Sequence, residues 1–145
     1  MEKIRLATEN DIPRILELYE ELTEEKQNVP LESIHRVFAE IAALPNQQFL
    51  VIEKDELVLG TLFLQITPNL SHSTRPWAIL ENLVVDHRYR GLGFGRLLIE
   101  HALGTCRKAG CYKVQLLSSN KRKGAHQFYR SLGFKESAVG FRLYL

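Results

Sequence analysis

The feature that most constrains this sequence is a mostly apolar stretch, residues 77–86, followed closely by a glycine-rich turn at Gly91–Gly95. Such a stretch predicts a strand that is covered on both of its faces. Apolar residues then recur at helical spacing from about Arg96 to Ala109, and Gly110 is placed to end that helix. A buried strand, a tight turn and a helix in this order indicate a sheet with helices packed against it.

Along the rest of the chain, apolar residues recur either at the two-residue period of a strand or at the 3.6-residue period of a helix. Strands are expected at residues 3–7, 48–53, 57–67, 112–117, 134–137 and 140–145, and helices at about 12–22, 34–44 and 125–132. The predicted order is β-α-α-β-β-β-α-β-α-β-β. The fold class is therefore α/β (α+β mixed), a mixed sheet flanked by helices on both faces, in a single domain spanning residues 1–145.

Composition excludes several classes of function. Apolar residues make up 45% of the chain and charged residues 25%, the balance of a globular protein with its own core. A net charge of +2 is too small to indicate a nucleic-acid partner, and no apolar run is long enough to cross a membrane. With no apolar signal segment, Cys106 and Cys111 are expected as reduced thiols in a cytoplasmic protein. No histidine or cysteine spacing indicates a metal site.

The glycine turn has the character of an anion site. Glycine lets a ligand approach the main chain, and the free N–H groups at a helix start favour an anion such as phosphate. Three cations, Arg88, Arg90 and Arg96, cluster at this helix start, where they oppose the helix dipole unless an anion lies between them. The alternative is a helix start with solvated arginines and a loop that needs glycine only for its shape.

Two common phosphate-binding motifs do not fit this turn. A Walker loop needs G-x-x-x-x-G-K-[ST], which is absent. A dinucleotide fold needs G-x-G-x-x-G after its first strand and an acidic residue about 20 positions later. Here the spacing is Gly91-x-Gly93-x-Gly95 after the fourth predicted strand, and Gln115 in the next strand is not acidic. Both motifs are therefore disfavoured.

The run Arg90-Gly91-Leu92-Gly93-Phe94-Gly95 resembles the R/Q-x-x-G-x-G/A signature of the GNAT family of N-acetyltransferases. The resemblance follows the element order over nearly the whole chain and is strongest from residue 79 to residue 134. It implies that acetyl-CoA is the co-substrate, without a metal. It also implies that the pyrophosphate is bound by the main chain of Arg90, Gly91, Leu92, Gly93, Phe94, Gly95 and Arg96. Leu83, Val84 and Val85 would pair with the amides of the pantetheine arm along a splayed strand.

The same resemblance implies a general acid and a further coenzyme contact. Tyr129 lies nine residues beyond Asn120 and follows Phe128, like the family pattern of an Asn after the fifth strand and a Phe-Tyr on the next helix. In the family that tyrosine reaches the coenzyme sulfur and the Asn contacts the pantetheine arm. The alternative for Tyr129 is a place on the apolar face of its helix, at core spacing with Ala125 and Leu132.

Glu81 is the candidate general base. It interrupts an apolar stretch that is expected to be buried, and carboxylates are rarely buried without a partner or a task. Several family members use a glutamate at this place, often through a water. The alternative is a paired structural acid near the splay of the sheet. Asn82 beside it is expected either to line the site or to satisfy a strand edge.

The acceptor is left open by these residues. The stretch 79–134 also resembles the glucosamine-6-phosphate N-acetyltransferases, but Leu117 and Asn82 stand where that group has acids. We expect direct transfer to a primary amine of a small molecule in a ternary complex. The alternatives are a protein or peptide N-acetyltransferase and a non-catalytic acyl-CoA-binding module. The resemblance also allows a homodimer.

The family builds its acceptor pocket from the first two helices, their connection and the loop before the fourth strand. In this chain the last two are about residues 23–31 and 69–77. His72, Arg75 and Trp77 of that loop are candidates for recognising an anionic or aromatic acceptor. The alternatives are that they fold the loop or lie at a dimer interface.

Overall fold

The computed structural model describes residues 1–145 and groups them into two compact units, residues 1–115 and 116–145. The strands, all in the first unit, are β1 (Lys3–Leu6), β2 (Gln47–Lys54), β3 (Leu57–Thr67), β4 (Trp77–Val85) and β5 (Lys113–Gln115). The helices of the first unit are α1 (Ile12–Thr23), α2 (Leu31–Ala42), the short α3 (Ser71–Thr74) and α4 (Phe94–Lys108). Helix α5 (Lys123–Ser131) belongs to the second unit. Short 3-10 helices precede α1 at Glu9–Asp11 and follow β4 at His87–Tyr89.

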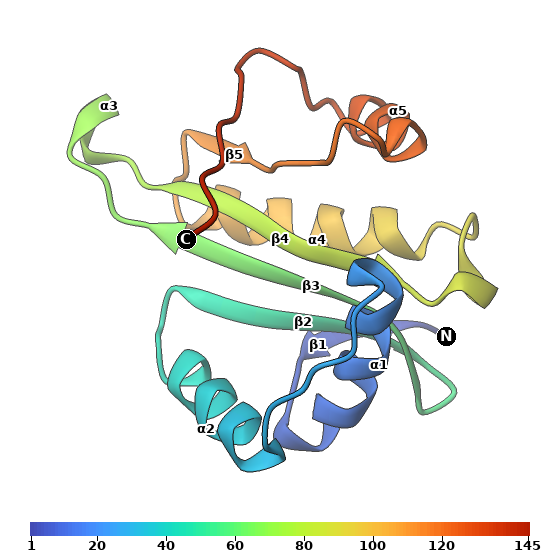
Figure 1. Cartoon of the computed structure of the whole chain (residues 1–145). Coiled ribbons are helices and arrows are strands. Elements are labelled where there is room, and N and C mark those ends of the chain that lie inside the picture. The colour runs from blue at the N-terminus through green and yellow to red at the C-terminus, as the bar shows by residue number, and fades with distance from the viewer. The chain divides into compact units, whose positions relative to one another are not determined.

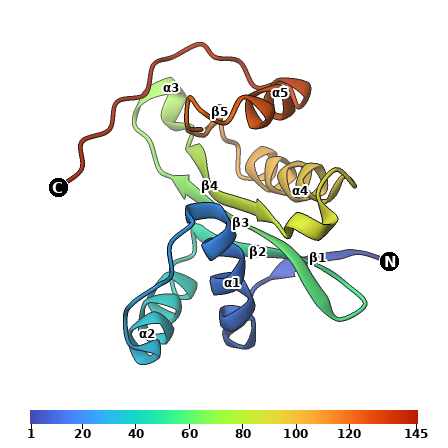
Figure 2. The same ribbon diagram turned by 45° about the vertical axis from the view of Figure 1, so that its right-hand side comes forward.

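The first unit is built on a five-stranded mixed sheet with the strand order β1-β2-β3-β4-β5 (Figure 1). The first four strands are antiparallel neighbours, whereas β4 and β5 run parallel. β2 and β3 form the expected hairpin, and Asp55 and Glu56 at its turn both have positive φ angles. α1 and α2 lie on one face of the sheet and α4 on the other (Figure 2). This arrangement confirms the predicted fold class.

The sheet is splayed between β4 and β5. The parallel pairing of these strands ends at Ile79 opposite Gln115. β4 continues to Val85, so residues 80–85 have no neighbouring strand on the β5 side. The main-chain polar groups on that side therefore need partners other than a strand.

β4 also contains a bulge next to the splay. Phe63 of β3 lies opposite Glu81, but Thr61 lies opposite Val84, so β4 has one extra residue between these pairs. Asn82 within the bulge has a φ of 54°. Asparagine adopts this left-handed conformation more readily than most other residues do. The bulge thus lies beside Glu81, the candidate general base of the sequence analysis.

The core lies between the sheet and the helices on each face. On the α1 face, Ile15 and Leu18 pack with Val51, Val58 and Val84 of three strands. On the other face, α4 buries Leu98, Ala102 and Cys106, which recur at every fourth position, together with Phe94 and Ile99. This spacing gives α4 one continuous apolar face. Cys106, which is 1% exposed, is thus a core residue.

The second unit consists of α5 and the segments around it. The Gly133 N–H donates to the carbonyl of Arg130 at 3.0 Å, and the Phe134 N–H donates to that of Tyr129 at 3.1 Å. Gly133 has a φ of 94°, so a left-handed glycine closes the helix. No helix in either unit combines the length and the apolar character that crossing a membrane requires.

The two closing strands predicted at residues 134–137 and 140–145 are absent, which corrects the end of the predicted order. Their apolar side chains are largely exposed, as at Phe141 (91%) and Leu143 (85%). A strand persists only when its main chain is hydrogen-bonded to a neighbour, and these residues join no ladder. β5 is likewise shorter than the predicted 112–117, because its ladder to β4 extends over only three residue pairs.

Candidate active site

The turn between β4 and α4 is shaped by two glycines in the left-handed region. Gly91 has a φ of 77° and Gly93 a φ of 93°. A Cβ at either position would meet no atom within 4 Å, so the dihedral angle and not the available space requires glycine. Gly93 caps α4, which begins at Phe94 and not at the predicted Arg96.

The first main-chain N–H groups of α4 are directed out of the helix at this turn. The first bond within the helix runs from the Leu97 N–H to the Gly93 carbonyl at 3.1 Å. Helix geometry leaves the N–H groups before it without an acceptor in the helix. Together with the helix dipole, such groups attract an anion. The turn therefore has the geometry expected of a pyrophosphate site.

The three arginines near the turn are each paired with a carboxylate of the protein itself. The pairs are Arg88 with Asp86 at 2.7 Å, Arg90 with Glu21 at 3.2 Å, and Arg96 with Glu100 at 3.6 Å. The sequence argument that these cations need a bound anion is therefore wrong, because internal carboxylates offset their charge. Arg90 also donates from Nε to the carbonyl of Val85 at 2.9 Å, which links the turn to the end of β4.

Asp86 anchors the beginning of the turn. Its side chain is 1% exposed. It accepts hydrogen bonds from the guanidinium of Arg14 on α1, from the main-chain N–H of Arg88 at 2.9 Å and from the Arg88 guanidinium. These donors, Arg88 first, hold the pKa of the Asp86 carboxyl well below its usual range. Asp86 thereby fixes α1 to the residues that follow β4.

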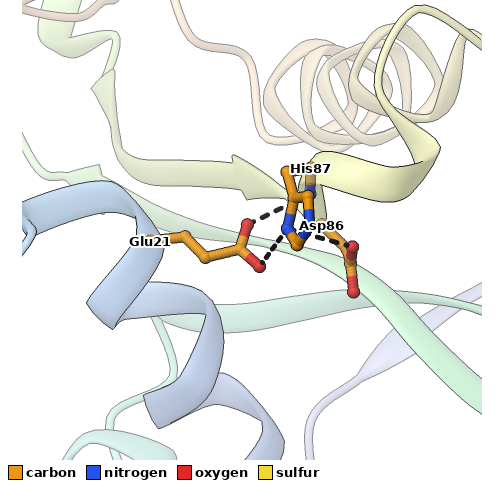
Figure 3. Close-up of side chains that lie close together, drawn as sticks. All are labelled: Glu21, Asp86 and His87. Atoms are coloured by element: carbon orange, nitrogen blue, oxygen red, sulfur yellow. Dashed lines mark hydrogen bonds and ion pairs between the residues drawn. The ribbon is translucent and has the colours of Figure 1, made fainter.

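A second carboxylate reaches the turn from α1 (Figure 3). Oε2 of Glu21 accepts the main-chain N–H of His87 at 3.1 Å, and Oε1 lies 3.0 Å from Nδ1 of the same residue. Arg90 donates to Oε2 at 3.2 Å. We term Glu21, His87 and Arg90 the α1 clasp, because one side chain of α1 holds both ends of the segment that leads into the glycines.

The grouping of Glu21, Asp86 and His87 also has the spacing of a metal site, with one ligand atom from each within 4.8 Å of the others. Its surroundings argue against that function. Guanidinium groups of Arg14, Arg88 and Arg90 already donate to the two carboxylates. A divalent cation would have to displace these groups or lie against their positive charge. The grouping is better described as an ionic network that positions the turn.

Glu81 lies beside the bulge of β4, but its side chain is exposed. The expectation of a buried carboxylate is therefore wrong. Leu80 and Val84 are buried, whereas Glu81 and Asn82 between them are both exposed. Alternation along the strand already places Glu81 on the side opposite the buried Leu80, and the extra residue of the bulge leaves Asn82 exposed as well. Glu81 is a candidate base through its place at the splay of the sheet and not through burial.

The strand segment expected to pair with the pantetheine arm is bound to the protein on one side only. Val84 is buried in the core, and Leu83 and Val85 are half-buried. Val84 and Val85 pair with Thr61 and Gly60 of β3. The opposite edge of this segment lies beyond the end of the β5 ladder, so no strand occupies it.

In the second unit, Tyr129 lies on α5 near two aromatic rings. The ring centroids of Phe128 and Phe134 are 5.4 and 6.0 Å away. Burial raises the pKa of Tyr129, and Arg122 offsets part of that shift. The phenol therefore keeps its proton at neutral pH, as a general acid must. Asn120 is exposed in the turn before α5.

The loop before β4 is held by its own side chains. Arg75 donates from Nε and Nη2 to the carbonyls of Gly110 and Cys111, at 3.1 and 2.9 Å. The ring of His72 stacks on that of Tyr112, with centroids 4.0 Å apart. These contacts favour the alternative in which Arg75 and His72 fold the loop and do not recognise an acceptor.

A cavity of about 330 Å³ lies between α1, α2 and β2. Gln27 and Val29 of the α1–α2 connection line it, as expected of an acceptor pocket, but no residue of the 69–77 loop does. The apolar spacing of α2 by itself predicts a helix packed into the core, and only the family resemblance places a pocket at the first two helices. In the structure α2 has no buried residue. We term this cavity the α1–α2 pocket.

A splayed mixed sheet, with a glycine turn between its fourth strand and α4, defines the class of the protein as an acetyltransferase. The family described as "Acetyltransferase (GNAT) family" matches residues 14–134. The chain is similar to a glucosamine 6-phosphate N-acetyltransferase of Trypanosoma brucei brucei, with 33% identity over 97% of this chain and 94% of that protein. It is also similar to an aminoalkylphosphonate N-acetyltransferase of Salmonella typhimurium, with 29% identity over 96% and 88%.

A solved structure agrees with these sequence matches. The glucosamine-6-phosphate N-acetyltransferase of Arabidopsis thaliana superposes with a TM-score of 0.88 at 28% identity, over 99% of this chain and 98% of that one. The chain therefore belongs to the GNAT acetyltransferase family, whose members use acetyl-CoA as co-substrate.

Proposed function

We propose that the protein transfers the acetyl group of acetyl-CoA to the primary amine of a small molecule, by direct attack in a ternary complex. The observation that carries this proposal is the glycine turn, where Gly91 and Gly93 present the N–H groups of the α4 start to an anion. The relatives support a small acceptor, since two of them are named for glucosamine 6-phosphate and for an aminoalkylphosphonate, which are both small amines.

In this proposal the main chain of residues 90–96 binds the pyrophosphate, and residues 83–85 pair with the pantetheine arm through the open edge of β4. The turn follows the carboxyl end of β4. An arm that runs back along the strand from the turn therefore brings its thioester towards Glu81 and Asn82. Asn120 of the second unit is assigned a contact with the arm by its match to the family pattern.

Glu81, directly or through a water, takes a proton from the ammonium of the acceptor, because an alkylammonium has no lone pair. The amine nitrogen then attacks the acetyl carbon, so that a C–N bond forms and the C–S bond breaks. Main-chain N–H groups of β4 stabilise the negative charge that develops on the carbonyl oxygen. Tyr129 gives its proton to the departing thiolate and regains one from solvent, while the nitrogen releases its second proton to solvent as the neutral amide forms.

The proposal is tested by release of free thiol from acetyl-CoA over a panel of amines. Glu81→Gln and Tyr129→Phe should each lower kcat by about 100-fold, the lower end of what acid–base groups contribute, while acetyl-CoA affinity is retained. Glu56→Gln and Tyr144→Phe, at exposed positions, are the matched controls and should leave kcat unchanged. Binding of acetyl-CoA without thiol release from any amine would contradict catalysis. Release with peptide amines alone would contradict a small acceptor.

A further inference from the structure

The only two cysteines of the chain lie together at the end of α4. Gly110 follows the helix in the left-handed region, with a φ of 80°. The Cys111 N–H donates to the Cys106 carbonyl at 3.0 Å, and the Gly110 N–H donates to the carbonyl of Arg107 at 3.1 Å. These two bonds define a Schellman motif, in which Cys106 is the third residue from the end of the helix and Cys111 follows the glycine.

A Schellman motif brings the side chains of these two positions together, and they commonly make an apolar contact across the end of the helix. Here both side chains are thiols. Burial raises the pKa of the Cys106 thiol to about 12, and the neighbouring Cys111 thiol adds to that shift. The main-chain bond between the two residues is compatible with the α-carbon separation of roughly 4.4–6.8 Å that a disulfide spans. The end of α4 therefore holds two thiols that face each other.

The main chain of Cys111 is fixed from its other side as well. Arg75 donates from Nη2 to the Cys111 carbonyl at 2.9 Å. The next N–H, that of Tyr112, donates to the Pro76 carbonyl at 3.0 Å. Because its N–H and its carbonyl are both bound, Cys111 stays opposite Cys106. The fold has thus already ordered the segment that a bond between the two sulfur atoms would close.

The two thiols differ in their access to solvent. Cys106 is 1% exposed, whereas Cys111 is half-buried. A small oxidant in solution therefore reaches Cys111 first. Cys106 is shielded from that oxidant, so the sulfur of Cys111 is the electrophile within its reach. This difference gives the two residues separate roles in one reaction.

We infer that Cys106 and Cys111 form a reversible intramolecular disulfide when the protein is exposed to hydrogen peroxide. The Cys111 sulfur attacks one oxygen of the peroxide, which gives a sulfenic acid and one water. The Cys106 sulfur then attacks the sulfenic sulfur, so that the S–S bond forms and the hydroxyl leaves with the Cys106 proton as a second water. The two thiols are oxidised by two electrons and the peroxide is reduced. The inference is independent of the proposed function, in which neither thiol takes part.

The test identifies the product of the reaction. Protein treated with hydrogen peroxide is quenched with catalase, unfolded, alkylated with N-ethylmaleimide and weighed by mass spectrometry. Wild type should lose two hydrogen atoms and take up no maleimide, and dithiothreitol should restore both thiols. Cys106→Ser removes the resolving thiol, so dimedone should trap at least tenfold more sulfenic acid than in wild type. Cys111→Ser should keep its buried thiol reduced and take up one maleimide.

A disulfide found only between chains would overturn the inference, and so would equal trapping of sulfenic acid in wild type and Cys106→Ser. Melting temperatures check that both variants are folded. A second measurement needs wild type alone. In glutathione redox buffers, the effective concentration of the thiol pair should be at least tenfold higher in native protein than in urea, because the folded end of α4 holds the two residues together. Equal values in native and unfolded protein would also overturn the inference.

Discussion

Glu21 and His87 are joined by two contacts although 66 residues separate them in sequence. The carboxylate of Glu21 accepts the main-chain N–H of His87 and lies against its ring nitrogen. Glu21 is on the same helix as Tyr19, whose side chain lines the α1–α2 pocket. One helix therefore borders the α1–α2 pocket and also holds the segment that leads into the glycine turn.

The α1 clasp should contribute measurably to stability. Glu21→Ala removes an acceptor of the His87 N–H and the partner of Arg90, and should lower the free energy of unfolding by about 1 kcal/mol. Glu20→Ala is the matched control, since Glu20 is exposed and its side chain takes part in none of these contacts. Urea denaturation of the two variants gives the comparison. Equal stabilities would show that the clasp contributes nothing.

Arg14 binds two carboxylates of very different burial. Replacing the buried one should therefore cost more stability than replacing the exposed one. Asp86 is 1% exposed and Glu17 is 66% exposed. Asp86→Asn removes the buried one of the two charges that face the partly buried guanidinium of Arg14 and should cost about 3 kcal/mol. Glu17→Gln breaks a surface pair and should cost less than about 0.5 kcal/mol. A cost for Glu17→Gln equal to that for Asp86→Asn would contradict the importance of burial here.

The contribution of Asp86 to stability should also depend on pH. Its folded pKa is lowered by Arg88 and Arg14, and that of Asp11 is lowered by Arg5. A lowered folded pKa gives stability that is fully present above the unfolded value of about 3.9 and is lost as the pH falls towards the folded value. The difference in unfolding free energy between wild type and Asp86→Asn should therefore be constant from pH 7 to about pH 5. It should shrink below about pH 4. A difference that grows on acidification would contradict this assignment.

The two cysteines should differ in reactivity. Cys106 is 1% exposed on α4, and burial raises its pKa to about 12, whereas Cys111 is only half-buried. A maleimide should label native protein at Cys111 alone, so that Cys111→Ser abolishes labelling and Cys106→Ala does not. For the same reason Cys106 is unsuited to carry an acetyl group. Mass spectrometry that found an acetylated Cys106 during turnover would contradict direct transfer.

The sequence predicts most of the fold because its local patterns are strong. The apolar run before the glycines predicts β4, and Gly110 correctly marks the end of α4. The start of α4 is misplaced by two residues, since Gly95 weakens the helical pattern in the first turn. The strands predicted at 134–137 and 140–145 fail for a different reason. An alternating pattern shows which side of a strand is apolar, but it does not supply the neighbour with which the strand must pair.

The site is predicted less completely, because its contacts are long-range. The glycine turn is found by its motif, whereas Glu21 looks like any other acid on a solvated helix face. The exposure of Glu81 is missed because a mostly apolar run predicts a strand covered on both faces, and nothing in the sequence shows that one face is open at this residue. Arg90 appears unpaired in sequence, since the acid that binds it comes from α1. The apolar period of α2 is that of a packed helix, so the pocket is expected only from the family resemblance and not from the helix pattern.

The central claim is that the N–H groups at the start of α4 bind the diphosphate of the coenzyme, and calorimetry with coenzyme A and pantetheine tests it most directly. Gly93 and Gly110 flank the same helix with φ angles of 93° and 80°, and a Cβ at either would meet no atom within 4 Å. Gly93→Ala and Gly110→Ala should therefore cost similar stability, about 1 kcal/mol each. Gly93→Ala alone should weaken binding of coenzyme A, by about tenfold, without changing that of pantetheine. Equal affinities of wild type for the two ligands, or no heat with coenzyme A, would contradict the claim.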